Sequence, residues 1–242
     1  MDTKAVIFDK DGTLLDFDAC WLKIADYAIA DIMEQFNARD IPADEVVSAL
    51  GVCNGIASIL GALCCGTYTQ IGTIIHNIFE QYKHNFNEDE VIAATIDAFE
   101  NNSNKGEIKA ACDNIADVLL TLKSYNLKLA VVTTDTHSST MKHLEALGIK
   151  DLFDAIYTDD GSFPAKPHPF CINDFCEREG LLTSQVVMVG DTLTDVSFAH
   201  NGGIDMIGVS KSEANTAILK NKTPIVVPDI SYVLDAIKQQ GD

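Results

Sequence analysis

The sequence predicts an α/β protein built on a doubly wound parallel sheet with an α-helical insertion. Short apolar runs rich in β-branched residues alternate with segments of helical periodicity, which is typical of a parallel sheet covered on both faces. The expected strands are residues 4–9 (KAVIFD), 128–134 (KLAVVTT), 155–158 (AIYT), 185–191 (QVVMVGD), 205–210 (DMIGVS) and 224–228 (PIVVP). The gap between the first two runs is far longer than one crossover helix, which indicates an insertion.

The segment between these two runs is predicted to be wholly helical. Apolar residues at three- and four-residue spacing indicate a first helix over residues 21–36. Pro42, followed by two acidic residues, suits the first turn of a second helix. Residues 68–85 predict a third, and Asn87 with Glu90 resembles a capping box that opens a fourth.

Two compositional features define the expected domains. The polar stretch 101–106 (NNSNKG) reads as a linker, and the apolar stripe from Ile108 to Leu122 predicts the first helix after it. We therefore expect residues 17–101 to form a helical domain. Residues 1–16 and 102–242 should together form the sheet domain.

Residues 46–79 carry no charged side chain, and part of this stretch is almost long enough to span a bilayer. Its glycines, its polar residues and the lack of basic flanks argue against that interpretation. A buried helix–loop–helix, or an apolar surface that closes over a site, explains the stretch better. It could also form a dimer interface, so we expect a monomer or a homodimer.

Charge and cysteine usage exclude several classes of function. The formal net charge of −19 argues against binding to nucleic acid or to anionic membranes, both of which require a Lys/Arg patch. The seven cysteines show no C-x-x-C spacing, and Met1-Asp2-Thr3 leads straight into the first strand. These features favour a reducing, cytoplasmic location.

Polar residues gather where the predicted strands end. Asp9 and Asp11 follow the first run, and Thr133 and Thr134 follow the second. Further on are Lys166, in the loop after the third run, and Asp191 and Asp195, after the fourth. In an open α/β sheet, ligands bind at the carboxyl ends of the strands, so we expect these side chains to converge.

Four converging carboxylates need a positive partner. At about 4 Å and an effective dielectric constant near 20, each like-charged pair costs roughly 4 kcal/mol. A divalent cation removes this repulsion, and carboxylate oxygens with retained waters are the ligands that Mg²⁺ prefers. Such an ion would also supply positive charge for an anionic substrate. The sequence therefore predicts Mg²⁺ as the cofactor.

These motifs resemble the four motifs of the haloacid dehalogenase-like (HAD) phosphohydrolase superfamily, in the same order. The matching segments are DKDGTL (9–14), Thr133 after AVV, Lys166 before a proline, and GDTLTD (190–195). The likeness covers the whole chain, because the insertion matches the helical cap found between the first two motifs in phosphoglycolate phosphatase-like members. It implies a HAD-like, Rossmannoid core with a cap domain.

The resemblance implies a role for each residue. Asp9 would be the nucleophile that forms an aspartyl-phosphate, and Asp11 would protonate the leaving group and then activate water. Mg²⁺ would be held by Asp9, the Asp11 main-chain carbonyl and Asp191, with Asp195 binding directly or through water. Thr133 and Lys166 would hold the non-bridging phosphate oxygens. Thr134 is the alternative to Thr133.

Structural roles are also open for some of these residues. Asp191 and Asp195 could cap a helix N-terminus instead of binding metal. Lys10 stands where many relatives carry an apolar residue. Strand alternation points it away from Asp9 and Asp11, which favours a structural pairing over catalysis.

The predicted function is an Mg²⁺-dependent phosphatase that acts on a small phosphate monoester, such as phosphoglycolate. A phosphomutase of the same superfamily keeps the same motifs and stays open. A receiver-like phosphoacceptor module is the alternative from another class, although such domains lack a helical insertion. The weak candidates for substrate contact in the cap are Asn54, Thr67, Tyr68, Thr69 and Gln70.

Overall fold

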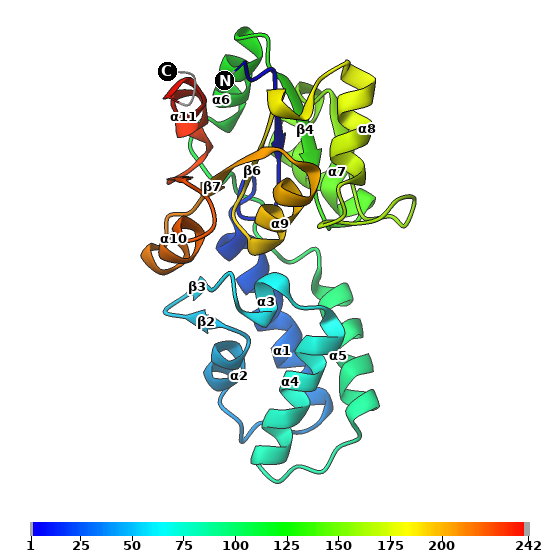
Figure 1. Cartoon of the computed structure of the whole chain (residues 1–242). Helices are drawn as coiled ribbons and strands as arrows, with labels where there is room; N and C mark the ends of the chain where they lie inside the picture. Colours follow the sequence, from blue (N-terminus) through cyan, green and yellow to red (C-terminus); the bar gives the residue numbers. More distant parts are fainter. Residues whose placement is uncertain (1, 240–242) are drawn as a thin grey trace. The chain divides into compact units, whose positions relative to one another are not determined.

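The structure, a computed structural model, describes residues 2–239 and divides into two compact units. The first comprises Met1–Phe17 and Ile108–Asp242, and the second comprises Asp18–Glu107 (Figure 1). The second boundary falls after Glu107, at the end of the expected linker, whereas we expected it after residue 101. The reason is local: the last helix of the insertion runs to Asn102, and the Glu107 amide donates to the Ala19 carbonyl.

The first unit holds a six-stranded parallel sheet. The strands follow the order β5-β4-β1-β6-β7-β8. Their bounds are β1 Ala5–Phe8, β4 Lys128–Val132, β5 Ala155–Tyr157, β6 Val186–Gly190, β7 Asp205–Val209 and β8 Ile225–Val227. All six predicted strands are present, which confirms the doubly wound α/β fold. β1 lies in the middle, with Phe8 beside Val131 of β4 and Val189 of β6.

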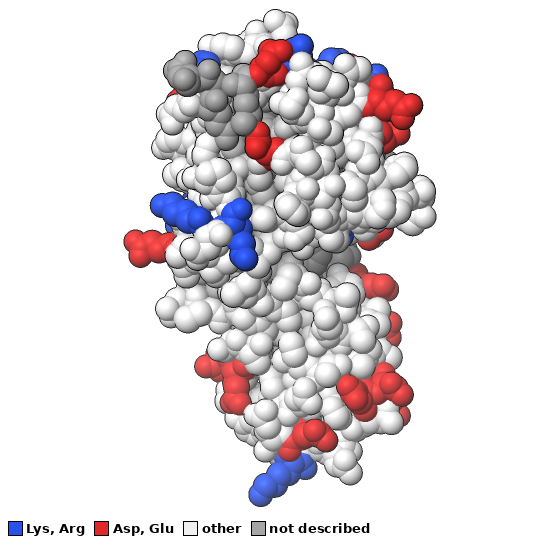
Figure 2. All heavy atoms as spheres, in the orientation of Figure 1, with Lys and Arg blue, Asp and Glu red and all other residues white. Residues whose placement is uncertain are grey.

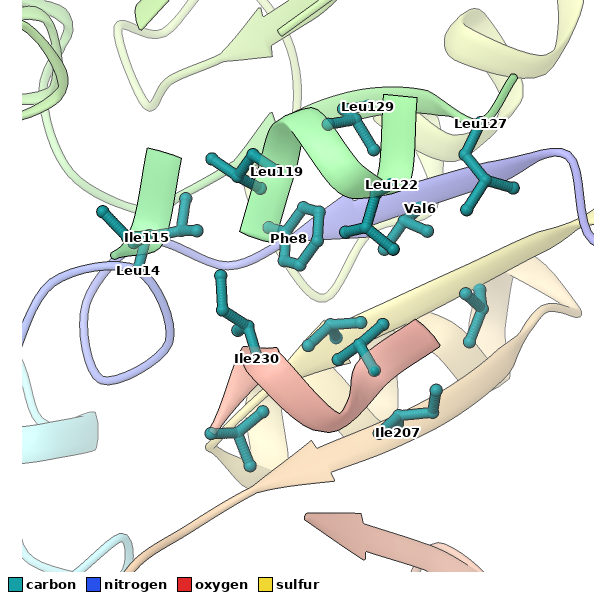
Figure 3. Close-up of a cluster of buried hydrophobic side chains, with 14 of the residues drawn as sticks. Val6, Phe8, Leu14, Ile115, Leu119, Leu122, Leu127, Leu129, Ile207 and Ile230 are labelled. Atoms are coloured by element: carbon teal, nitrogen blue, oxygen red, sulfur yellow. The ribbon is translucent and has the colours of Figure 1, made fainter. Parts of the chain in front are cut away.

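Helices cover both faces of this sheet because the strand residues are apolar on both sides. Val6 and Phe8 belong to the core under α6, α7 and α11 (Figure 3), whereas Ala5 and Ile7 belong to the core under α8 and α9. The helices are α6 Ile115–Ser124, α7 His137–Ala146, α8 Phe170–Glu179, α9 Leu193–Gly202, α10 Glu213–Lys220 and α11 Val233–Gln239; short 3₁₀ turns span Lys150–Leu152, Thr183–Gln185 and Ile230–Tyr232.

One helix boundary was predicted wrongly. The apolar stripe from residue 108 suggested a helix there, but α6 begins at Ile115, after Asn114 in the left-handed region. Residues 108–112 instead run beside the loop after β1, where the Asp16 amide donates to the Lys109 carbonyl and the Ala111 amide to the Leu14 carbonyl. Residues 108–112 are extended and buried on one side, so their apolar positions also fit a helical period.

The second unit is a helical domain with its own core. Its elements are the π-helical turn Asp18–Leu22, α1 Lys23–Gln35, α2 Ala43–Ala49, β2 Val52–Cys53, β3 Ile56–Ala57, α3 Ala62–Cys65, α4 Tyr68–Gln81 and α5 Glu88–Asn102. α5 packs against both α1 and α4. The Asn87 side chain accepts a hydrogen bond from the Glu90 amide and so caps α5, as the sequence suggested.

The expectation that the insertion is wholly helical was wrong. Within the uncharged stretch, β2 and β3 form a two-stranded antiparallel hairpin. Its turn is Asn54-Gly55, with φ of 52° and 73°. An Asn-Gly pair between apolar residues is the strongest short-range hairpin signal, because both central residues of a type I′ turn need positive φ.

Two sequence expectations concern a membrane-spanning segment and a basic surface patch. Among the described residues, no helix is both long and apolar enough to cross a membrane. On the face shown in Figure 2, acidic side chains are scattered and the basic ones form small separate groups.

Candidate active site

The strand order places the candidate site at a topological switch point. Chain connections run outward in opposite directions from β1 and β6, and loops part at the carboxyl ends of such neighbouring strands. Asp9 directly follows β1 and Asp191 directly follows β6. The Asp9 amide donates to the Val189 carbonyl, which continues the pairing to this edge.

Lys166 links Asp9 to Asp195. Its Nζ donates to Asp9 Oδ1 at 2.5 Å and to Asp195 Oδ1 at 2.7 Å, and all three side chains are buried. Lys166 lies in the loop before α8, between Pro164 and Pro167. The structure therefore brings together an amine and two carboxylates that lie far apart in the sequence.

Asp195 also closes the start of α9. Its Oδ2 accepts from the Thr192 amide at 3.0 Å and from Thr192 Oγ1 at 2.7 Å, while Thr192 caps the helix in return. The suggested capping role is thus present. Because Oδ1 accepts from Lys166, one carboxylate both anchors the helix and holds the lysine.

Asp191 lies against the loop after β1. Thr13 Oγ1 donates to Asp191 Oδ1 at 3.1 Å. Gly12 has φ of 85°, and a Cβ there would lie 2.1 Å from Asp191 Oδ2. Glycine is therefore required at this position for both its conformation and its lack of a side chain.

The electrostatics of these carboxylates fit a cation site. One oxygen each from Asp9, Asp191 and Asp195 lie within 4.8 Å of one another. Burial, together with the charges of Asp195 and Asp11, outweighs Lys166 and raises the pKa of Asp9 to about 7. Burial and the charges of Asp9 and Asp195 raise the pKa of Asp191 well above its usual value. An all-oxygen set that repels itself in this way suits a hard divalent cation.

Lys166 responds in the opposite sense. Burial disfavours its charged form, but the carboxylates of Asp195 and Asp9 outweigh that effect and raise the pKa of Lys166. The ammonium therefore stays charged at neutral pH and can face an anionic ligand.

Asp11 lies beside a second buried lysine that sequence reasoning interpreted only in part. Lys10 Nζ is 2.7 Å from Asp11 Oδ1, 3.0 Å from Asp135 Oδ2 and 3.1 Å from His143 Nδ1. The expected structural pairing of Lys10 is present. Its expected direction away from Asp11 was wrong, because β1 ends at Phe8 and the turn that follows no longer alternates like a strand.

The two threonines after β4 differ in burial. Thr133 is buried, and its Oγ1 accepts a hydrogen bond from the Asp135 amide at 3.1 Å. Thr134 is exposed. Thr133 thus lies at the strand end with its hydroxyl oriented by the loop. Its contact with phosphate stays a prediction.

Several cap candidates have local structural roles. Thr67 and Gln70 form the capping box of α4, and Tyr68 stacks on Phe99 with ring centroids 5.1 Å apart. Asn54 lies in the hairpin turn. Thr69 and Gln70 also line a hollow of about 740 Å³ within the second unit. A substrate contact for these five residues stays a prediction.

Comparison with known proteins places this arrangement in a family. The sequence model of the haloacid dehalogenase-like hydrolases matches residues 67–209, more than half of the chain. The chain belongs to the haloacid dehalogenase-like hydrolase family. It is accordingly an enzyme of the hydrolase class.

Individual relatives of this HAD hydrolase agree in length and fold. It is 26% identical over 239 residues to the phosphoglycolate phosphatase of Pasteurella multocida, covering 97% of this chain and 98% of that one. A structure described as a predicted phosphoglycolate phosphatase from Haemophilus somnus superposes with a TM-score of 0.73 at 22% identity, covering 98% and 99% of the two chains. The magnesium-bound HAD-hydrolase YfnB of Bacillus subtilis gives a TM-score of 0.64 at 17% identity, covering 97% and 98%.

Proposed function

We propose that this HAD hydrolase is an Mg²⁺-dependent phosphatase that cleaves a small phosphate monoester through an aspartyl-phosphate on Asp9. The observation that carries the proposal is the contact of Lys166 with both Asp9 and Asp195 beside Asp191, at the switch point of the sheet. This arrangement would provide a nucleophile in Asp9, a fixed positive charge in Lys166 and carboxylate oxygens that could bind the metal.

The chain's own residues divide the reaction between them. Asp9 would attack phosphorus while Lys166 balances charge on the non-bridging oxygens, with Thr133 as a further donor. Asp11 would give a proton to the departing alcohol and later take one from the attacking water. Mg²⁺, held by Asp9, the Asp11 carbonyl, Asp191 and directly or through water by Asp195, would supply positive charge that favours the ionised form of Asp9 and the bound phosphate.

Phosphoglycolate is the first substrate to test. Support comes from the full-length similarity to a relative that bears the name phosphoglycolate phosphatase, and magnesium is supported by the metal named for YfnB. We further propose a cytoplasmic monomer or homodimer whose partner is a small phosphorylated metabolite. The finer choice of ester would be made by the helical insertion acting as a cap.

The test measures phosphate release from a panel of esters, with and without Mg²⁺. Activity should require Mg²⁺ and stop on addition of EDTA. Asp9→Asn should lower kcat by at least about 10⁴-fold, because the nucleophile is lost. Phosphoglycolate should rank highest by kcat/KM.

The controls separate the competing functions. Circular dichroism and thermal unfolding of Asp9→Asn should match the wild type. Robust turnover by that variant, or indifference to EDTA, would refute the proposal. Isomerisation of a sugar phosphate without phosphate release, followed by ³¹P NMR, would identify a phosphomutase instead.

A further inference from the structure

The ammonium of Lys10 is a fully buried charge with no role in the proposed reaction. Lys10 has no exposed surface. Burial disfavours its charged form, but the carboxylates of Asp11 and Asp135 outweigh that effect and raise its pKa, so it remains an ammonium. Such a buried charge needs partners on every side.

Three side chains surround the ammonium of Lys10, two as hydrogen-bond acceptors and one, Asp135, as an ion-pair partner. They are Asp11 Oδ1 at 2.7 Å, Asp135 Oδ2 at 3.0 Å and His143 Nδ1 at 3.1 Å. Since the lysine can only donate, His143 accepts through Nδ1, and its ring proton lies on Nε2. Burial and the charge of Lys10 lower the pKa of His143, which agrees with a neutral ring.

These partners tie Lys10 to the loop and helix that follow β4. His143 lies on α7. The Asp135 amide donates to Thr133 Oγ1 at 3.1 Å, and Asp135 Oδ1 accepts from the Thr136 amide at 2.7 Å. Asp135 is therefore fixed by its own loop. Through Lys10, the same loop holds the carboxylate of Asp11, which stands after a different strand.

We propose that Lys10, fixed by Asp135 and His143, is a positioning residue that orients the carboxyl group of Asp11 for proton transfer to the leaving group. Lys10 donates to Oδ1, so the proton that Asp11 transfers is carried by Oδ2. In that step the bond from Asp9 to phosphorus forms, the phosphorus–ester oxygen bond breaks, and the alcohol oxygen takes the Oδ2 proton. This inference rests on the proposed phosphatase function.

The test compares two esters that depend differently on proton donation. An alkyl phosphate releases a poor leaving group that needs a proton, whereas p-nitrophenyl phosphate releases a stable phenolate. The parameter is kcat/KM, which covers the steps up to release of the alcohol and excludes later hydrolysis of the aspartyl-phosphate. The alkyl ester is whichever one gives the wild type its highest kcat/KM.

Lys10→Met keeps an unbranched side chain, one atom shorter than lysine, and removes the donor. We expect kcat/KM for the alkyl ester to fall about 10²-fold and that for p-nitrophenyl phosphate to fall less than about tenfold, because only the former needs a placed acid. Lys123→Met is the matched control. Lys123 is a half-buried lysine that donates to the Leu152 carbonyl and pairs with Asp154, and its loss should leave the ratio of the two values unchanged.

Variants of His143 test the same idea without emptying the lysine site. His143→Leu removes the acceptor and should shift the ester ratio in the same direction as Lys10→Met, by a smaller factor. His143→Asn offers an amide oxygen near the position of Nδ1 and should restore the ratio. Circular dichroism of each variant reports whether it folds.

The outcomes separate this inference from the function on which it rests. A wild type that hydrolyses neither ester refutes the proposed function. An active wild type whose folded Lys10→Met and His143→Leu variants lose both activities equally, or lose neither, refutes the positioning role alone. If Lys10→Met does not fold, the two His143 variants decide the question.

Discussion

Two buried lysines at the carboxyl edge of one sheet show how similar ion pairs can serve different ends. Lys166 and Lys10 each bridge two carboxylates, and each has a raised pKa because those carboxylates outweigh burial. The difference lies in the number of side chains around the ammonium. In the described part of the chain Asp9 and Asp195 contact Lys166 Nζ, which leaves an N–H for a phosphate oxygen, whereas Asp11, Asp135 and His143 all lie within 3.1 Å of Lys10 Nζ.

The two lysines also belong to different sides of the sheet. Asp9 lies on the same side of the sheet as Ala5 and Ile7, which is the side covered by α8 and α9. There it accepts a hydrogen bond from Lys166. Lys10 contacts His143 on α7, whose neighbour Leu144 packs in the core with Val6 and Phe8. One strand end thus serves two clusters. Under the two proposals above, Lys166 would bind the substrate and Lys10 would hold Asp11.

The largest effect that would sharpen this comparison is expected from Lys166→Met. Removing the ammonium leaves Asp9 and Asp195 without their shared cation and removes a donor to the phosphate. We expect kcat/KM to fall about 10³-fold for alkyl and aryl esters alike, because non-bridging oxygens are common to both. Steady-state kinetics on the two esters measure this. A loss confined to the alkyl ester would give both lysines the same role and break the distinction.

A smaller loss is expected from Asp195→Asn. The carboxylate accepts on both oxygens, from Lys166 on Oδ1 and from Thr192 on Oδ2, whereas an amide offers only one acceptor. We expect kcat to fall about 10²-fold at saturating Mg²⁺, equally for both esters, because the fixed donor position of Lys166 is lost. Asp135→Asn, the equivalent change beside Lys10, should instead alter the ester ratio. An unchanged kcat for Asp195→Asn would show that Lys166 needs no second anchor.

The sheet and the residues at its edge were predictable because each depends on local or topological rules. Continuous apolar runs mark buried parallel strands, and the carboxyl ends of such strands meet at one edge. The convergence of Asp9, Asp191 and Asp195 with Lys166 follows from this rule, although the residues are distant in the chain. Their roles in catalysis stay predictions that the experiments above test.

The contacts of Lys10 could not be predicted in the same way. Alternation still separates Lys10 from Asp9, but it fails at Asp11, because the chain turns there and brings Asp11 beside Lys10. His143 gave no signal in the sequence, since a single histidine on an amphipathic helix usually belongs to the core. By contrast, the Asn54-Gly55 pair is a readable hairpin signal, but strands of only two residues leave no alternating pattern beside it.

The smallest effect is expected from Thr192→Ala, which asks how firmly Asp195 is held on the Lys166 side. The hydroxyl caps α9 and donates to Asp195 Oδ2, but the Thr192 amide donates to the same oxygen and would remain. We expect a loss of about 1 kcal/mol in the free energy of unfolding and only a several-fold fall in kcat. Urea unfolding and phosphate release measure the two quantities.

Ser212→Ala is the control: it removes the cap of α10, and its matched loss of stability should leave kcat unchanged. A fall in kcat for Thr192→Ala as large as that for Asp195→Asn would mean that the hydroxyl, rather than the backbone, positions the carboxylate against Lys166.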